Sequence, residues 1–285
     1  MLNTSLVRPA EFRDQQSISN LIFFEARVHR HLDWRSPLDW LGTPFFWVLE
    51  EEAYVTAALA CPQEMQGIAW LRLFAYGGRW SPQSAWDSLW NTAHNELARA
   101  GGSTVAVIAT QPWFQSILRT SGFVNRQHIV LLEWQCQPWS AREANAVRIR
   151  PMNEADLPRV SEVDGAAFDP LWQISLKTLR QAYAQAAIVT VVEDGRDMIG
   201  YQLSTRNARG AHLARLAVHP DAQGRDIGTM LLSDLFFRLW QRGITRLSVN
   251  TQHDNQASLA LYQKMGFLRT GEQFPVFTLE IPAKG

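Results

Sequence analysis

The sequence contains little cysteine, no excess of either charge and no long apolar run. Its two cysteines, Cys61 and Cys136, form no CxxC pair and have no histidines at ligand spacing. This disfavours a disulfide scaffold and a structural zinc site. The 27 basic and 27 acidic side chains give zero net charge, so we expect no general electrostatic binding to nucleic acid or anionic lipid.

Membrane and export signals are also missing. No apolar run reaches the ~18–20 residues that a membrane-spanning helix needs. The first residues (MLNTSLVRP) lack the basic segment followed by an apolar one that is typical of a signal peptide. We therefore expect a cytoplasmic protein with no membrane partner.

What is present is the composition of a folded globular protein. Apolar residues make up 46% of the 285 residues and charged residues 19%, and at roughly 150 residues per domain the length predicts two domains. A polar stretch around Pro138 separates two strand-like apolar runs. We therefore place the domains at 1–138 and 147–285, with a linker at 139–146.

The two halves resemble one another at both ends. Each opens on a short apolar strand ending in Arg-Pro, and the two arginines, Arg8 and Arg150, lie 142 positions apart. Each closes on a helical stretch followed by Gly-Phe, and the two glycines, Gly122 and Gly266, lie 144 positions apart. Two anchors at nearly one offset indicate a duplicated domain rather than a solenoid.

The second half alternates strand and helix patterns. Apolar side chains spaced i,i+4 predict a long helix from about Arg225 to Arg242, and a shorter helix is predicted from about Asn255 to Met265. The expected strands are 187–193, 198–204, 212–218, 245–250 and, closing the domain, 275–281. The expected fold class is α/β (α+β): each half forms a mixed, mostly antiparallel twisted sheet flanked by helices.

The segment from Leu216 to Gly228 has the features of a phosphate-binding turn. An apolar strand ends at Pro220, a short turn with two glycines follows, and the long helix begins at once. The first turn of a helix has N–H groups without partners and positive potential, and glycine allows a ligand close to the backbone. An ordinary turn into a helix would use the same residues.

Two polar side chains share one face of the shorter helix. Asn255 and Tyr262 are seven residues apart, which is nearly two helical turns. An amide and a phenol could therefore line the same groove. The structural alternatives are a helix N-cap for Asn255 and a half-buried core position for Tyr262.

Together these segments resemble the GNAT superfamily of acyl-CoA-dependent N-acyltransferases, and the resemblance covers Val147 to Ile281 in element order. The family's pyrophosphate-loop pattern, Gln/Arg-x-x-Gly-x-Gly/Ala, corresponds to QGRDIG at 223–228. The resemblance implies two tandem GNAT-like domains and acetyl-CoA as co-substrate. It implies cofactor contacts along the strand and loop at Leu216, Ala217, Val218, Gln223, Gly224, Arg225, Asp226, Ile227, Gly228 and Thr229. It further implies that Asn255 contacts the cofactor and that Tyr262 protonates the leaving thiolate.

Two positions depart from the family pattern. Asp226 stands where the family usually has glycine, and two like charges ~4 Å apart at an effective dielectric of ~20 repel by about 4 kcal/mol. We expect weakened acetyl-CoA binding, with the carboxylate turned outward, paired with Arg225 or favouring the helix N-terminus. Asn250 stands where some relatives have a glutamate base, which leaves His219, Glu193 or a water chain to deprotonate the amine.

The first half lacks the residues that the resemblance assigns to the cofactor. At an offset of 144, the loop 223–228 falls on 79–84 (RWSPQS), which has no glycine and includes Pro82, a residue without an N–H. Gln111 and Leu118 take the places of the asparagine and the tyrosine. We interpret the first domain as a degenerate copy with the same fold and no cofactor site.

Two further patterns in the first half have structural explanations. Ten of the 12 tryptophans lie at or before Trp139, and they could fill a vacated groove, form a domain interface or build a Trp-rich core. His29 and His31 resemble a ligand pair, but i,i+2 residues do not share a helix face. No metal site is expected.

The leading hypothesis is an acetyltransferase in which an amine attacks the thioester directly and backbone amides near Val218 stabilise the oxyanion. Phe168, Trp172, Phe274 and Phe277 would frame the acceptor pocket, which suggests a small-molecule amine or a peptide N-terminus. The alternative is an acyl-CoA-binding sensor or scaffold with little turnover. A plain interaction module, the third reading, would not bind acetyl-CoA. The oligomeric state is left open.

Overall fold

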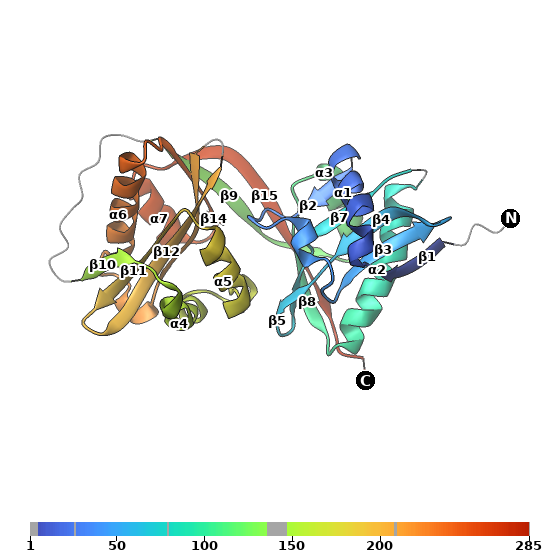
Figure 1. The fold of residues 1–285 in the computed structure, drawn as a ribbon, viewed down its shortest axis with the longest axis horizontal. Helices are drawn as coiled ribbons and strands as arrows, with labels where there is room; N and C mark the ends of the chain where they lie inside the picture. The colour runs from blue at the N-terminus through green and yellow to red at the C-terminus, as the bar shows by residue number, and fades with distance from the viewer. Residues whose placement is uncertain (1–4, 26, 79, 136–146, 208–209, 285) are drawn as a thin grey trace. The chain divides into compact units, whose positions relative to one another are not determined.

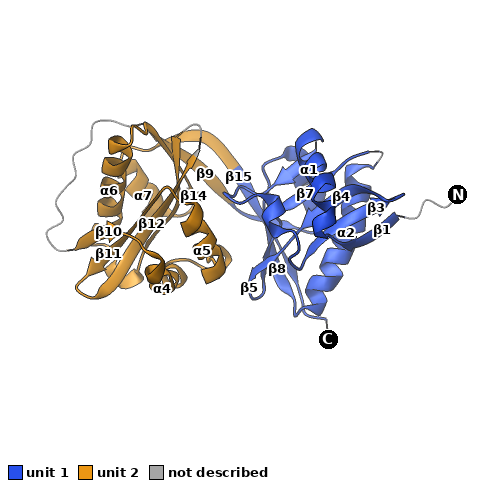
Figure 2. Ribbon diagram, in the orientation of Figure 1, with its two compact units in different colours: residues 1–127, 274–285 blue, residues 128–273 orange. Residues whose placement is uncertain are grey.

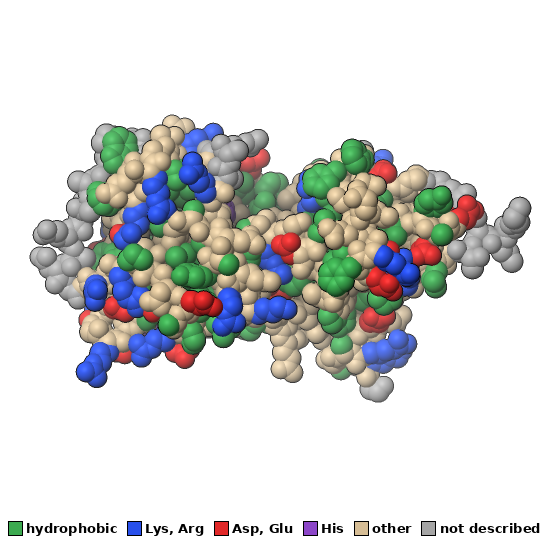
Figure 3. Space-filling model, in the orientation of Figure 1, with side chains coloured by type: hydrophobic (Ala, Val, Ile, Leu, Met, Phe, Trp, Pro, Cys, Tyr) green, Lys and Arg blue, Asp and Glu red, His purple; other side chains and the backbone are tan. Residues whose placement is uncertain are grey.

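The protein was analysed as a computed structural model that describes residues 5–25, 27–78, 80–135, 147–207 and 210–284 (Figure 1). The chain divides into two compact units, residues 1–127 with 274–285 (unit 1) and residues 128–273 (unit 2) (Figure 2). The expected linker at 139–146 lies outside the described residues. On the face drawn in Figure 3, basic and acidic side chains are interspersed. None of the described helices is long and apolar enough to span a membrane.

Unit 1 contains two sheets covered by helices. Their strand orders are β1-β3-β4-β7-β2 and β15-β8-β6-β5. The strands are β1 (Ser5–Pro9), β2 (Val28–Arg30), β3 (Phe46–Glu51), β4 (Tyr54–Ala60), β5 (Gln63–Met65), β6 (Ile68–Trp70), β7 (Leu73–Tyr76), β8 (Ser103–Ile108) and the last part of β15 (Leu268–Ile281). The helices are α1 (Gln15–Phe24), α2 (Pro82–Arg99) and α3 (Pro112–Thr120), with 3-10 turns at Phe12–Asp14 and Pro37–Trp40.

From its first strand to its last helix, unit 2 has the element order expected from the sequence. Its strands run in the order β10-β11-β12-β13-β14-β9, and all neighbours are antiparallel except β13 and β14. They are β10 (Arg148–Pro151), β11 (Ile188–Asp194), β12 (Asp197–Asn207), β13 (Gly210–Val218), β14 (Arg246–Gln252) and part of β9 (Val124–Gln135). The helices are α4 (Leu157–Ala167), α5 (Leu176–Gln185), α6 (Ile227–Gln241) and α7 (Gln256–Lys264), with 3-10 turns at Glu154–Asp156, Pro170–Trp172 and Pro220–Ala222. The mixed, mostly antiparallel fold class is confirmed.

Two strands pass from one unit to the other, and this differs from the expected division at 138 and 147. β9 starts in unit 1 and its later residues pair with β14 in unit 2. β15 starts in unit 2, but residues 276–281 pair with β8 in unit 1. The segment expected to close the second domain therefore closes the sheet of the first. Phe277, expected beside the acceptor pocket, is fully buried in the core of unit 1.

An arginine-centred ion network confirms the internal duplication. In unit 1, Arg8 donates to both oxygens of Asp14 at 2.7 and 2.8 Å and to Glu50 at 2.7 Å. In unit 2, Arg150 donates to both oxygens of Asp156 at the same two distances. Its second acidic partner, Glu193, accepts at 2.6 Å. The arginine side-chain hydrogen bond lowers the pKa of each aspartate. The network ties the first strand to the start of the first helix in both copies.

Both units also contain a pair of parallel strands that separate. In unit 2, β13 and β14 pair from Ala211 to Leu213 of β13, after which the strands diverge. In unit 1, β6 pairs with β8 over residues 68–70, and the chain then continues as β7 beside β4. In unit 2 the edge of β13 beyond Leu213 has no further strand partner among the described residues, and this is where the resemblance places a cofactor arm.

The tryptophans of unit 1 contribute to its core. Trp47 and Trp86 are almost completely buried, and Trp86 stacks on Trp90 of the same helix with ring centroids 5.1 Å apart. Trp86 also meets Phe74 and Phe114 edge-on. These contacts favour the Trp-rich core among the three explanations for the described tryptophans.

Candidate active site

The edge of β13 that faces away from β12 is open where the strand leaves β14. Parallel pairing reaches only to Leu213, and beyond it no described strand pairs with this edge. On the other edge, the N–H of His219 donates to Ile199 of β12 at 2.9 Å. Because successive residues of a strand point their backbone groups to opposite edges, those of Leu216 and Val218 face the open edge. An extended chain can pair there as an added strand.

The three residues expected to hold a pantetheine arm are therefore not equivalent. Leu216 and Val218 present their backbone groups to the opening, whereas Ala217 presents its groups to β12. The side chain of Gln223 donates to the Val218 carbonyl at 3.2 Å. This bond ties the start of the loop to the end of the strand.

The turn between β13 and α6 has backbone N–H groups that find no acceptor in the part of the chain that the structure describes. The first hydrogen bond across the start of α6 runs from Met230 N–H to the carbonyl of Asp226 at 3.0 Å. Within the described residues, no acceptor is found for the N–H groups of Gly224, Arg225, Ile227, Gly228 and Thr229. Unpaired donors at a helix start bind anions such as phosphate. The donor set expected from the sequence is thus present.

Asp226 has a backbone conformation that explains why glycine is usual at its position. Its φ of 58° and ψ of 14° lie in the left-handed region, which glycine adopts without strain and aspartate tolerates. Its carboxylate accepts from the Lys264 ammonium at 2.7 Å and from the Thr229 hydroxyl at 3.3 Å. Pairing with Arg225 was one expectation, but Arg225 instead binds Asp194 at 2.7 Å. A lysine of α7 therefore neutralises the unusual carboxylate.

We expect the substitution Asp226→Gly to tighten acetyl-CoA binding by about tenfold. It removes a carboxylate from an anion-binding turn and releases the Lys264 ammonium, and a tenfold change in affinity corresponds to about 1.4 kcal/mol. Lys264→Gln should weaken binding, because it removes the cation that neutralises the carboxylate. Calorimetric titration of the two variants and the double variant measures both effects. Unchanged or weaker binding by Asp226→Gly would contradict this account.

α7 packs directly against the start of α6. A Cβ atom at Gly228 would lie 2.8 Å from Leu261 Cδ2, so glycine permits the close approach of the two helices. Asn255 is the N-cap of α7, because its side chain accepts from the N–H of Ser258 at 3.1 Å. Asn255 thus has the N-cap role that the sequence offered as its structural alternative. Its side-chain nitrogen lies 3.4 Å from Gln252 Oε1.

Tyr262 lies in the core beside the diverging strands. Its side chain shares a hydrophobic cluster with Leu213 of β13 and Val249 of β14, and Leu216 packs on the same cluster. Burial raises the pKa of Tyr262 above the usual value, so the phenol is protonated at neutral pH. No hydrogen bond to its hydroxyl is found within the described residues, and the residue is 5% exposed. Among those residues the phenol proton therefore has no acceptor.

The two candidate bases named from the sequence have other partners. Glu193 is bound by Arg150 in the duplicated ion network, in the role that Glu50 has in unit 1. His219 Nδ1 accepts from the N–H of Asp221 at 3.3 Å. The contacts of these two side chains therefore do not identify either of them as the base.

The residues expected to frame an acceptor pocket fall in different units. Phe168 and Trp172 lie in the segment between α4 and α5 of unit 2, whereas Phe274 begins the segment that belongs to unit 1. Sequence reasoning missed the side chains that hold the first two residues, Asp164 and Arg215. These are joined by two hydrogen bonds of 2.7 and 2.8 Å. The apolar surroundings of Asp164 in α4 were the available signal.

In unit 1, the strand edge that corresponds to the open edge of β13 is covered by another strand of the same unit. β2 pairs with β7, with His29 opposite Phe74, along the edge equivalent to the open edge of β13. His29 is fully buried, its Nε2 lies 3.3 Å from the Leu71 carbonyl and its ring stacks on Phe114 at 4.6 Å. His29 thus lies in β2, and His31 directly follows this strand. A strand of the chain itself occupies the position where a cofactor arm would pair.

The helix start in unit 1 is also closed. Ser81 caps α2 by accepting the N–H of Ser84 at 3.0 Å, and Pro82 contributes no N–H. Both differences follow from the sequence RWSPQS that replaces the glycine-containing loop. The first helical turn of α2 therefore lacks the donor set found at α6.

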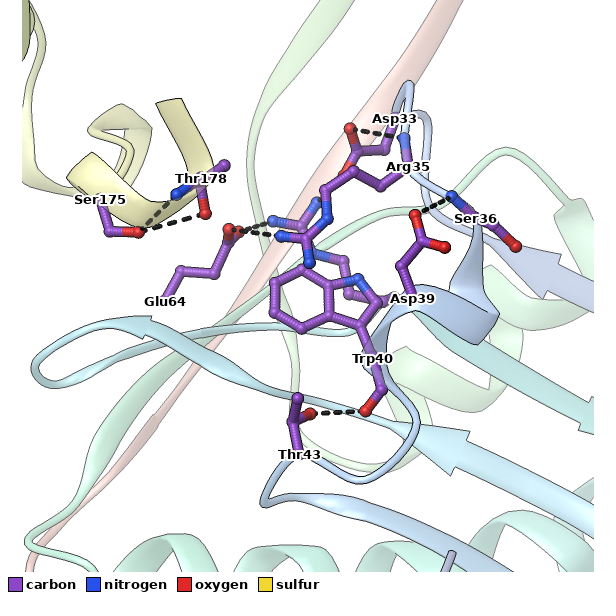
Figure 4. Close-up of polar contacts among 10 residues, drawn as sticks. Asp33, Arg35, Ser36, Asp39, Trp40, Thr43, Glu64, Ser175 and Thr178 are labelled. Carbon is purple, nitrogen blue, oxygen red and sulfur yellow. Dashed lines mark hydrogen bonds and ion pairs between the residues drawn. The ribbon is translucent and has the colours of Figure 1, made fainter. Parts of the chain in front are cut away.

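A buried ion cluster holds the segment that follows β2. The Arg35 guanidinium lies 3.5 Å from the centre of the Trp40 ring and 3.4 Å from Glu64 (Figure 4). Arg72, whose carbonyl accepts from His31 N–H at 3.0 Å, also binds Glu64 and lies 2.9 Å from Asp33. Since all these groups lie within unit 1, they stabilise β2 in its place beside β7.

Comparison with known proteins agrees with this architecture. Residues 157–267 match the model of the acetyltransferase (GNAT) family. The chain is 27% identical over 119 residues to a curated [ribosomal protein bS18]-alanine N-acetyltransferase of Haemophilus influenzae, covering 42% of this chain and 80% of that protein. The Escherichia coli enzyme of the same name gives the same identity, and 79% of it is covered.

Solved structures share the fold over almost the whole chain. A GCN5-related N-acetyltransferase from Sphaerobacter thermophilus has a TM-score of 0.67 at 16% identity, covering 99% of this chain and 97% of that one. A tandem GNAT protein from the clavulanic acid biosynthesis pathway also has a TM-score of 0.67, at 17% identity, covering 99% and 100%. The expected enzyme class, an N-acetyltransferase, is confirmed by the family match. Residues 157–267 thus match the acetyltransferase (GNAT) family, and the chain shares the fold of a tandem GNAT protein over almost its whole length.

Proposed function

We propose that unit 2 transfers an acetyl group from acetyl-CoA to a primary amine. The observation that carries this proposal is the set of unused N–H groups at the start of α6, next to the open edge of β13. The amides of Gly224 to Thr229 would hold the pyrophosphate, and the backbone of Leu216 and Val218 would pair with the pantetheine arm. Both features suit a ligand that has a diphosphate and an extended amide-containing chain.

The amine attacks the thioester carbonyl directly, without a covalent enzyme intermediate. Backbone amides near Val218 stabilise the oxyanion, and the carbon–sulfur bond then breaks. Tyr262 gives its proton to the departing thiolate. Because its pKa is raised by burial, proton donation is favourable only if the phenolate is reprotonated promptly. The proton released by the amine leaves through water, since Glu193 and His219 have other partners.

The acceptor is a small-molecule amine or a peptide N-terminus. The curated relatives are named as N-acetyltransferases that act on an alanine of ribosomal protein bS18. Phe168 and Trp172 offer apolar surface in the segment between α4 and α5, which suits the side chain of a small apolar first residue. A peptide that begins with alanine is therefore the first acceptor to test.

A second candidate is an acyl-CoA-binding sensor with little turnover. Asp226 favours it, because a carboxylate in the anion-binding turn opposes tight cofactor binding. Tyr262 opposes it, because a protein that only binds has no need of an acid. Release of free CoA in the presence of a panel of amines and peptides separates the two: acceptor-dependent release identifies the enzyme, and binding without release identifies the sensor.

We expect one acetyl-CoA per chain, bound in unit 2. In unit 1, β2 occupies the strand edge and Ser81 with Pro82 closes the helix start, so the degenerate copy has no cofactor site. Isothermal titration of the full chain with acetyl-CoA should give a stoichiometry of one. Two sites would contradict the degenerate copy, and no binding would contradict both the enzyme and the sensor.

A further inference from the structure

A single buried carboxylate collects hydrogen bonds from three parts of unit 2. Asp164 of α4 is 1% exposed. It accepts from Arg215 of β13 in a bidentate pair, from the Tyr201 hydroxyl of β12 at 2.5 Å and from the backbone N–H of Ile174 at 3.3 Å. One carboxylate thus joins a helix, two strands and the segment that connects α4 to α5.

Arg215 extends this network to the same connecting segment. Its second terminal nitrogen also donates to the Trp172 carbonyl at 2.7 Å, and its guanidinium lies 3.9 Å from the centre of the Phe168 ring. The Gln173 side chain adds two further hydrogen bonds. It donates to the carbonyls of Gly165 in α4 and of Phe168 in the segment, at 2.9 Å each. The segment 168–174 is therefore fixed by contacts with one arginine and one aspartate.

The position of Arg215 along β13 connects these contacts to the cofactor strand. Arg215 directly precedes Leu216, whose backbone faces the open edge. Neighbouring side chains of a strand point to opposite faces: Leu216 packs on the clusters that contain α6 residues, and Arg215 reaches α4. Any shift between the connecting segment and the cofactor strand has to break bonds made by Arg215.

We propose that Arg215, held by Asp164, is a positioning residue. It keeps the segment 168–174, which would line the acceptor side of the site, at a fixed distance from the thioester. This inference rests on the proposed function. A buried ion pair contributes little net stability compared with apolar groups of the same size, so stability alone does not account for it. A planar guanidinium can bind a carboxylate with two donors, a carbonyl with a third and an aromatic face at once, which an ammonium cannot.

The test compares Arg215→Lys with Arg238→Lys in the full chain. Arg238 pairs with Asp234 on α6 at 2.7 Å and serves as the matched control. With an alanine-initiated peptide as acceptor, we expect Arg215→Lys to raise the KM for the peptide at least tenfold. The KM for acetyl-CoA should stay within twofold, and Arg238→Lys should change neither. A general loss of structure would raise both KM values, because Arg215 lies in the cofactor strand itself.

A second readout needs no acceptor. Amide hydrogen exchange of residues 168–174 should rise at least tenfold in Arg215→Lys, while exchange at the start of α6 stays unchanged. Phe168→Leu, which removes the ring beneath the guanidinium without disturbing a charge, should raise the KM for the peptide about threefold. Equal peptide KM values for Arg215→Lys and the parent protein would overturn the inference. If the parent protein itself releases no CoA with any acceptor, the proposed function fails instead.

Discussion

Replacing Tyr262 by phenylalanine lowers kcat by about two to four orders of magnitude, the usual contribution of a positioned general acid, and leaves acetyl-CoA binding unchanged. The substitution keeps the ring that packs with Phe267 at 5.3 Å and removes only the proton donor. Steady-state turnover with a saturating amine, together with calorimetric affinity for acetyl-CoA, measures the two quantities separately.

Tyr183→Phe is the matched control for this experiment. Tyr183 lies on α5, and its hydroxyl is 3.5 Å from the Met152 carbonyl, so its loss should change kcat by less than twofold. The pH profile adds a second criterion. Because the pKa of Tyr262 is raised, the acid form persists above pH 10, the ordinary range of a tyrosine. A kcat for Tyr262→Phe within threefold of the parent would remove this residue from the mechanism.

Asp164→Ala lowers the free energy of unfolding by about 3–5 kcal/mol, the usual effect of removing one partner of a buried ion pair. The substitution leaves the Arg215 guanidinium buried without its carboxylate. It also removes the acceptor of the Tyr201 hydroxyl, which is completely buried. Calorimetric thermal unfolding of the full chain measures the loss as a lower transition temperature.

Asp234→Ala provides the comparison, since Asp234 pairs with Arg238 at 2.7 Å but remains partly exposed. Partly exposed ion pairs contribute about 0–1 kcal/mol, so this variant should melt close to the parent. Similar melting temperatures for the two alanine variants would mean that the Asp164 network contributes no more than a surface pair.

Local patterns in the sequence predicted most elements of unit 2. The apolar i,i+4 spacing placed the long helix at about 225–242, and it is observed at Ile227–Gln241. The arginines at offset 142 predicted the duplication, and both copies use them in the same ion network. Such features depend on residues near one another in the chain, where spacing determines which side chains meet.

Partners distant in the sequence were not predicted. An alternating apolar run identifies residues 275–281 as a strand, but it is equally suited to β8 or to a strand of unit 2, so the pattern does not select its neighbour. For the same reason, the pairing of β2 with β7 had no local signal. The prediction that Phe277 lies beside the acceptor was wrong because it depended on that choice.

In the candidate site, too, residues close in the sequence were predicted and partners distant in the sequence were not. The loop residues 223–228 were predicted as a group, because their backbone geometry follows from a compact motif. The Lys264 ammonium that neutralises Asp226 comes from 38 positions away, and Arg215 lies 51 positions from Asp164. A single sequence does not identify such ion pairs, because any acidic residue in it could pair with any basic residue.

The exchanged strand has a consequence for synthesis on the ribosome. The sheet of unit 1 needs residues 276–281, which emerge roughly 150 residues after the rest of that unit. At about 5–20 residues per second, the nascent first half waits on the order of 10 s or more with β8 exposing an unpaired edge. During that interval the growing chain is vulnerable to aggregation through that edge.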